Sequence, residues 1–574
     1  MKTSRMIINN NDDSNDGNDD HDNEDHDDAV SCSLPRLTQV NAKTAAPFLY
    51  SVSPISDRLL LYANHETANT NTSSSSSSGK SPSSSMLECI YPLSESRYTN
   101  HNHNHKHNHQ NDQDDDQHGS STSETILDKK ADASYLDILR ASVSDPTLSS
   151  FRLAKFYSDV DALTADVAYR HAASNSNSDS DTTTKNNNNN NNNNIAFVTA
   201  GHYHSRKIHQ TDISNDIILR CYPTHTGGAS MEIRTDALQR DEQGKEILVN
   251  VCFTSMVAVD PDTLRPVKNV IPKLIYSNSN SDSDSNSSSG GEEESRQRIR
   301  TEMAQQHGQI RKERFATSMQ LRHGPSSSPP TQQEMTDIHA LHQRVIMNPH
   351  PDTNGSSING NGSINGADAR ALPHVHQHTY RSSVVVYPEK RNVHGKLFGG
   401  FVMEQGHILA QYAADFYLDH SQPKNKNNKK NSTTNHNHSS SKPNGKQGDR
   451  DRAIPLGLDE AIFLQPIGIG DHVTFTARVV HSTPRTCRIV VIVEVRDPAD
   501  RHSAPLRSNR LSFLFGGSGF PNSGVSGVNG ESESGGGGIV PDGYNEILMH
   551  VDAKRRMDVE GPLDEEVERI LSEV

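Results

Sequence analysis

Hydrophobic residues gather in two stretches of the chain, and the later stretch shows the clearer pattern. Residues 381–388 (RSSVVVYP) form a β-branched run that ends at a proline, which predicts a short strand. Residues 401–418 follow without a proline, and their apolar positions recur at helical spacing, which predicts a long helix. The apolar residues expected on one face of this helix are Val402, Leu409, Ala413 and Phe416. Four strand-like runs come next, at 456–464, 471–482, 486–497 and 508–516.

The earlier stretch repeats this order. Residues 133–139 predict a strand, and residues 151–172 predict a helix with an apolar stripe at spacings of 3, 4, 3 and 4. The stripe consists of Leu153, Phe156, Val160, Leu163 and Val167. The strand-like runs that follow are 195–204, 216–223, 229–238 and 246–260. Because strands joined by short turns pair in antiparallel fashion, the chain predicts a duplicated α+β unit with one long helix and one antiparallel sheet in each copy.

Long polar tracts separate and interrupt the two stretches. Only 31% of the 574 residues are hydrophobic, so much of the chain buries too little apolar surface to offset the entropy lost on ordering. We expect long disordered, low-complexity tracts rich in Asn, Ser, Asp, His or Gly. The predicted organisation is a mostly disordered N-terminal region (1–130), a first domain (131–275), a linker with disordered tracts and a helical segment (276–377), a second domain (378–520) with a disordered insert (421–450), and a Gly/Ser-rich linker with a helical tail (521–574).

Charge and cysteine content argue against several classes of function. The formal net charge of −16 argues against nucleic acid as a partner. The five cysteines contain no Cys-x-x-Cys pair, so we expect reduced thiols in an intracellular protein without a disulfide framework. No apolar run reaches the ~20 residues of a membrane span. The His-rich stretch 101–109 is a weak metal candidate, and a low-complexity linker explains it better, so we expect no metal.

The junction between strand and helix in the later stretch carries a motif. Residues 391–410 (RNVHGKLFGGFVMEQGHILA) resemble the loop–helix signature of hotdog acyl-CoA thioesterases, in which Asn, two residues, Gly, two residues and Phe-Gly-Gly precede the helix. Residues 132–172, 227–233 and 251–270 resemble the first domain of double-hotdog, mitochondrial-type members also found widely in fungi, and 543–557 resembles their tail. The resemblance implies tandem hotdog domains, each with an antiparallel sheet wrapped around a long central helix. It also implies hydrolysis of fatty acyl-CoA to free fatty acid and coenzyme A.

The residues of this loop suit thioester hydrolysis, which needs one group to activate water and another to polarise the carbonyl. A helix N-terminus offers free N–H groups, and Gly399 and Gly400 would let an acyl group approach them; a tight strand-to-helix turn is the alternative. Asn392 can donate and accept at once and matches the family's catalytic Asn, although Asn also commonly caps turns. His394 is a candidate substrate contact, with a surface turn residue as the alternative.

The resemblance also places a catalytic carboxylate seven residues after the second motif glycine, where this chain has His407. The first helix carries Asp161 in the matching place, and Asp159 points about 160° away around the helix axis. The loop before that helix lacks both Asn-x-x-Gly and Gly-Gly, so each half keeps what the other has lost. Because the two helices of a double hotdog run antiparallel across the domain interface, we expect one composite site of Asn392 and Asp161 and one degenerate site. A solvent-facing Asp161, and His407 as the base, remain the alternatives.

An acyl-CoA hydrolase of this kind needs no metal or redox cofactor, since coenzyme A is part of the substrate. The main alternative is an inactive hotdog pseudo-dimer that binds acyl-CoA or a protein partner; a hotdog dehydratase fits the loop less well. The resemblance leaves open a homo-oligomer of pseudo-dimers. It also suggests mitochondria, but the N-terminus turns acidic within about a dozen residues and is no convincing targeting peptide, so the cytoplasm is the alternative location.

Overall fold

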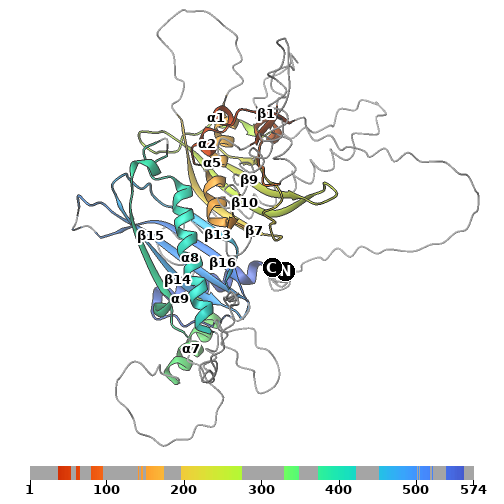
Figure 1. Cartoon of the computed structure of the whole chain (residues 1–574). Coiled ribbons are helices and arrows are strands. Elements are labelled where there is room, and N and C mark those ends of the chain that lie inside the picture. Colours follow the sequence, from red (N-terminus) through yellow and green to blue (C-terminus); the bar gives the residue numbers. More distant parts are fainter. Residues whose placement is uncertain are drawn as a thin grey trace, which may run out of the picture. The chain divides into compact units, whose positions relative to one another are not determined.

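The described part of the chain is a mixed α+β structure built on one 12-stranded sheet (Figure 1). The computed structural model describes residues 37–52, 60–64, 79–94, 140, 144–145, 150–173, 195–274, 329–347, 373–392, 394–421, 452–500, 502, 504–517, 520 and 538–560. The spatial order of strands is β1-β2-β4-β8-β9-β10-β7-β13-β16-β15-β14-β12, and all neighbouring pairs are antiparallel. The predicted strand at 133–139 and residues 422–450 of the predicted insert lie outside the described residues.

The later unit follows the predicted order. Its elements are β12 (Thr379–Val385), α8 (Gly399–Ser421), β13 (Ile454–Phe463), β14 (His472–Ser482), β15 (Thr486–Arg496) and β16 (Leu506–Gly516). On the predicted apolar face of α8, Val402 and Ala413 are buried, whereas Phe416 is 40% exposed, so this face is not buried along its whole length. The helix instead turns small residues to the sheet: a Cβ on Gly406 would lie 2.2 Å from Leu511 of β16. Hydrophobic spacing gives such small residues too little weight.

The earlier unit contains the predicted helix and the four strands that follow it. Its elements are α5 (Leu153–Ala172), β7 (Ala196–Lys207), β8 (Ile217–Thr226), β9 (Ser230–Arg240) and β10 (Glu246–Val259). All five residues of the predicted apolar stripe of α5 are buried, which confirms that prediction. The stripe joins the core that α5 shares with α8 and the sheet, so the two units have one continuous hydrophobic core.

Strands from the N-terminal region extend the sheet beyond β8. The N-terminal elements are β1 (Leu37–Val40), α1 (Ala42–Ala45), α2 (Pro47–Val52), β2 (Leu60–Asn64), η2 (Pro82–Ser85) and β4 (Leu87–Tyr91). β4 pairs with β8 in the same way that β12 pairs with β14. Three strands of this sheet, β1, β2 and β4, thus lie before residue 131, where the first domain is predicted to begin. Nothing local in the sequence marks β4 as part of the unit, because a long polar tract separates it from α5.

A helix near the C-terminus covers part of the sheet face opposite α8. The remaining elements are β3 (Gly79–Lys80), β5 (Ser144–Asp145), β6 (Ser150–Phe151), β11 (Lys273–Leu274), α7 (Gln332–Met347), η4 (Val375–His378), η5 (Pro388–Lys390) and α9 (Tyr544–Glu560). Met549 and Ala553 of α9 pack against Val480, Val490 and Ile492 of the sheet.

None of the helices in the described ranges has both the length and the apolar character that crossing a membrane requires.

The two units meet where β7 pairs with β13. The antiparallel register runs from Gly457 opposite Arg206 to Ile462 opposite Gly201. Glycine is needed on both strands, because a Cβ on Gly457 would lie 2.1 Å from the carbonyl oxygen of Ser205, and one on Gly201 would lie 2.7 Å from that of Ala461. This close pairing makes one sheet out of two units.

The helices α5 and α8 run antiparallel to each other. Asp161 of α5 contacts Gly400 at the start of α8, whereas Tyr157, one turn earlier on α5, contacts His407, about two turns further along α8. Along this contact, residue numbers therefore decrease on α5 as they increase on α8. The N-terminal half of each helix therefore lies beside that of its partner, so side chains of α5 can reach the first turn of α8.

A buried ion cluster lies at the join between the units. Asp459 of β13 lies 2.8 Å from Arg206 of β7 and 3.3 Å from Arg488 of β15, and its side chain is 1% exposed. Burial alone would raise the pKa of Asp459, but Arg488, Arg206 and Arg556 outweigh burial and hold that pKa well below its usual value.

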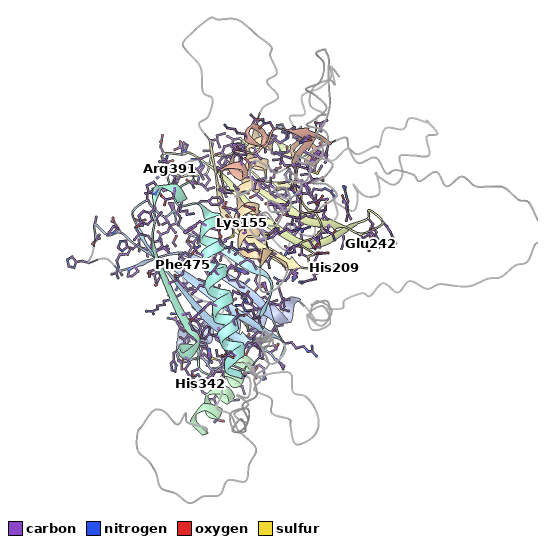
Figure 2. The ribbon with its side chains drawn as sticks, in the orientation of Figure 1. Lys155, His209, Glu242, His342, Arg391 and Phe475 are labelled. Atoms are coloured by element: carbon purple, nitrogen blue, oxygen red, sulfur yellow. The ribbon has the colours of Figure 1, made fainter. Side chains whose placement is uncertain are left out.

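Removing this carboxylate should destabilise the fold. Asp459→Ala leaves the buried guanidinium of Arg488 and the partly buried one of Arg206 without their shared anion, and we expect the free energy of unfolding to fall by about 3–5 kcal/mol. Equilibrium urea denaturation measures this loss. The control is Glu242→Ala, in the exposed turn labelled in Figure 2, which should change stability by less than about 0.5 kcal/mol. Equal stability of the two variants would show that the ion cluster does not hold the units together.

Candidate active site

The centre of the site is a carboxylate of one unit at the helix N-terminus of the other. Asp161 of α5 is 3% exposed, and its Oδ2 accepts the N–H of Gly400 at 2.6 Å. A Cβ on Gly399 would lie 2.9 Å from that oxygen, and one on Gly400 would lie 2.8 Å from Cα of Ser158. The glycine pair thus lets the helices approach closely enough for this bond. The structure brings Asp161, Gly399 and Gly400 together.

The other oxygen of Asp161 binds two side chains of β7. Oδ1 accepts the hydroxyl of Thr199 at 2.7 Å and lies 3.0 Å from Nε2 of His202. Nδ1 of His202 lies 2.9 Å from the hydroxyl of Thr254 on β10, and neither residue is exposed. No motif or spacing in the sequence marks Thr199, His202 or Thr254 as part of a site. Together they form a hydrogen-bonded chain behind Asp161.

A β-bulge in β7 explains why a regular strand pattern does not reveal Thr199 and His202. Thr199 and His202 are three residues apart, so a regular strand would turn them to opposite faces. Between β7 and β10, however, Thr199 pairs with Met256 while Gly201 pairs with Ser255, which leaves Ala200 as an extra residue. The bulge brings Thr199 and His202 to the same face, toward α5. The backbone of His204, at the second bulge, has φ of 54°, a conformation that non-glycine residues rarely adopt.

Asn392 organises the loop before α8. Its side-chain oxygen accepts the N–H groups of His394 at 2.9 Å and Lys396 at 3.0 Å, and its own N–H donates to the carbonyl of Lys396 at 2.6 Å. Gly395 permits this tight turn with φ of 68°. The side-chain oxygen therefore acts in the turn, as one of the alternatives proposed. Among the described hydrogen bonds, none joins Asn392 directly to Asp161.

His394 rests against the earlier unit. Its Nε2 lies 3.4 Å from the hydroxyl of Tyr169 near the end of α5, and that hydroxyl also accepts the N–H of Phe197 at 3.1 Å. Burial lowers the pKa of His394. The loop of the later unit, which begins at Arg391 in Figure 2, is thus attached to the earlier unit at both Asp161 and Tyr169.

Two neighbouring titratable residues have structural partners. Asp159 is fully buried and binds Lys155 at 2.5 Å and the hydroxyl of Tyr91 at 2.6 Å, which ties β4 to α5. Burial raises the pKa of Asp159, and Lys155 offsets part of that rise. His407 lies among aromatic rings, with ring centroids 5.7 Å from Tyr157 and 5.4 Å from Phe513.

One group of described residues has the composition of a metal site. His374, His376 and Asp542 place ligand atoms within 4.8 Å of one another, between η4 and the segment before α9. Nδ1 of His374 lies 2.6 Å from Asp542, and Nδ1 of His376 lies 2.9 Å from it. These hydrogen-bonded pairs account for the arrangement, so it does not identify a metal site. The His-rich stretch 101–109 lies outside the described residues.

Comparison with known proteins gives only distant likenesses. No family model matches the chain, and no curated protein matches it. Among solved structures, an acyl-CoA hydrolase from Staphylococcus aureus in complex with butyryl coenzyme A, coenzyme A and coenzyme A disulfide is 15% identical over 35% of this chain and 96% of its own, with a TM-score of 0.23. An acyl-CoA hydrolase from Bacillus cereus is 14% identical over 35% of this chain and 98% of its own, with a TM-score of 0.24. A protein named provisionally as an oleoyl thioesterase from Lactobacillus plantarum is 8% identical over 66% and 92%, with a TM-score of 0.30.

These likenesses are to acyl-CoA hydrolases and thioesterases, but each is weak. Because the TM-scores are low, the likeness decides neither the fold nor the activity of this chain. The function has to follow from the residues that the fold brings together around Asp161.

Proposed function

We propose that this chain is an acyl-CoA thioesterase with a composite active site, formed by Asp161 of α5 and the loop from Asn392 to Gly400. The observation that carries the proposal is the 2.6 Å hydrogen bond between Asp161 Oδ2 and the N–H of Gly400. It places a buried carboxylate of one unit at the positive end of the helix of the other. A proton acceptor beside a helix N-terminus is an arrangement that suits hydrolysis of an acyl compound.

We further propose that the two units are tandem hotdog domains. In sheet order, the later unit is β12-β14-β15-β16-β13 and the earlier unit is β4-β8-β9-β10-β7. Each order begins with the strand that precedes the helix along the chain and ends with the strand that follows it. The two units thus share one topology, and the antiparallel β7–β13 pair relates them by an approximate twofold.

In the proposed reaction, Asp161 acts as general base. It takes a proton from a water molecule whose oxygen attacks the thioester carbonyl carbon, and the carbonyl oxygen becomes an oxyanion. Because Gly400 donates its N–H to Asp161, other first-turn N–H groups of α8 and the side-chain NH₂ of Asn392 would stabilise the oxyanion. The tetrahedral intermediate then collapses, the carbon–sulfur bond breaks, and the coenzyme A thiolate leaves and takes up a proton. The fatty acid is released.

One observation favours the inactive pseudo-dimer as a second candidate. The side-chain oxygen of Asn392 is used inside its own turn, which leaves only the NH₂ group to act on a substrate. A protein that binds acyl-CoA without cleaving it would need no more from this loop. Measuring thiol release from acyl-CoAs of short, medium and long chain separates the two candidates, since the binding protein would show no turnover with any of them.

The first prediction for this site concerns the base. Asp161→Asn keeps the size of the side chain but removes the proton acceptor, so kcat for thiol release should fall by at least about 100-fold. The matched control is Glu404→Gln on the facing helix, whose carboxylate pairs with Arg152 and should be dispensable for the rate. Undiminished kcat in Asp161→Asn would disprove the composite site.

A second prediction separates the two roles of Asn392. In Asn392→Asp a carboxylate oxygen can still accept the N–H groups of His394 and Lys396, but the NH₂ donor is lost. If that donor acts on the thioester, Asn392→Asp and Asn392→Ala should both lower kcat by roughly 10²–10³-fold. Wild-type kcat in Asn392→Asp would show that Asn392 only shapes the loop.

A third prediction concerns the close approach of the helices. Gly399→Ala adds a methyl group 2.9 Å from Asp161 Oδ2 and 3.1 Å from the ring of Phe463, so one of them must move. Because such a shift misplaces the base, kcat should fall by roughly tenfold or more. Gly228→Ala is the control, since its methyl group would meet no atom within 4 Å. Equal rates for both variants would contradict this geometric requirement.

A further inference from the structure

We infer that His202 is a positioning residue of this site, which holds Asp161 so that Oδ2 faces the N-terminus of α8. The inference rests on the proposed function and assigns a role to a residue outside the loop motif. Its basis is that the two carboxylate oxygens of Asp161 have different partners. Oδ1 contacts His202 at 3.0 Å and Thr199 at 2.7 Å, whereas Oδ2 contacts Gly400 at 2.6 Å.

These separate contacts fix the rotation of the Asp161 carboxylate group. A free aspartate side chain rotates its terminal oxygens in a broad, roughly twofold well. Here two side-chain donors of β7 hold Oδ1 from the sheet side, and the helix N–H lies on the other side. Rotation would break all three contacts at once. Oδ2 is therefore held as the oxygen next to the first turn of α8, where the thioester is proposed to bind.

The contact with Asp161 determines which nitrogen of His202 carries the proton. The ionised carboxylate that a general base requires can only accept hydrogen bonds, so Nε2 of His202 must donate. In a neutral imidazole the other nitrogen, Nδ1, is then an acceptor, and the hydroxyl of Thr254 lies 2.9 Å from it. The chain runs from the Thr254 hydroxyl to Nδ1 and from Nε2 to Asp161. Each donor has one acceptor, and no charge on His202 is needed.

The surroundings of His202 hold it in place. It is completely buried, its ring lies edge-on to Phe463 of β13 with centroids 6.3 Å apart, and the sulfur of Cys252 is 3.9 Å from Nδ1. A histidine with both nitrogens bonded could also be an ordinary satisfied core residue. His202 differs from such a core residue in the partner of its Nε2. That partner is the carboxylate of Asp161, which also binds the N-terminus of α8.

The experiment compares His202→Leu with His202→Gln in the full-length chain. Leucine fills a similar volume without a donor, whereas the side-chain amide of glutamine can still donate to Asp161 and cannot become charged. We expect kcat for acyl-CoA hydrolysis to fall roughly 10–100-fold in His202→Leu with KM nearly unchanged, and to recover to within about fivefold of wild type in His202→Gln. Far-ultraviolet circular dichroism confirms that each variant is folded.

A double variant separates positioning from a general loss of structure. If His202 acts through Asp161, then His202→Leu should cause no further loss of kcat once Asp161→Asn is present. A further tenfold loss in the double variant would overturn the inference, as would His202→Gln that is folded but as slow as His202→Leu. If His202→Leu does not fold, Thr254→Val decides: it removes the hydroxyl at Nδ1 with little change in volume, and an unchanged kcat would overturn the inference.

The outcomes for the inference and for the proposed function are distinct. Wild-type protein that releases no thiol from any acyl-CoA would overturn the proposed function, and the role of His202 with it. Wild-type turnover that His202→Leu leaves intact would overturn the role of His202 alone. Turnover that depends on His202 in the wild type but not in Asp161→Asn supports both.

Discussion

The pairing of β7 with β13 is the contact on which the rest of the structure depends. It fuses two small sheets into one and places α5 and α8 antiparallel on the sheet. The backbones come so close there that Gly201 and Gly457 cannot be replaced without displacing the neighbouring strand. This arrangement brings Asp161, just before the middle of α5, to the first turn of α8. The proposed active site is thus a consequence of how the units join, since neither unit contains both Asp161 and the loop before α8.

Two buried carboxylates lie near this join, and their partners differ. Asp459 is surrounded by arginines, which lower its pKa and make it a permanent anion that holds strands together. Asp161 is held by a threonine hydroxyl, a backbone N–H and a histidine that can be neutral. Cationic partners would weaken a carboxylate as a proton acceptor, while neutral donors orient it at a smaller cost in basicity. The contrast fits a structural role for Asp459 and a chemical role for Asp161.

The sequence predicts a large part of this structure, and local physics explains where it stops. Periodicity finds both long helices and the eight strands that follow them, and the complementary losses in the two halves point to Asp161 beside the loop glycines. Periodicity does not predict β4 as part of the earlier unit. Its pairing with β8 is a contact across a long polar tract, and such a contact leaves no local signal in the sequence. Periodicity does not identify His202 either, because a bulge in β7 changes which residues of that strand share a face. The role of Asn392 in catalysis stays a prediction.

The twofold relation between the units would allow a second site, and the residues at its positions explain why only one site is expected in each chain. Counted from the first residue of its helix, Asp161 is eight residues beyond Leu153 (161 − 153), and His407 is eight beyond Gly399 (407 − 399). His407 therefore stands where the twofold would place a second acid, and Leu153 and Ala154 stand where it would place the two glycines. His407 packs against aromatic rings, and Leu153 and Ala154 are themselves buried. Buried apolar and aromatic contacts thus surround the positions that match the acid and the glycines of the first site. Both positions adjoin the same hydrophobic core, so the second position contributes packing, while the first keeps the polar groups that the proposed reaction requires.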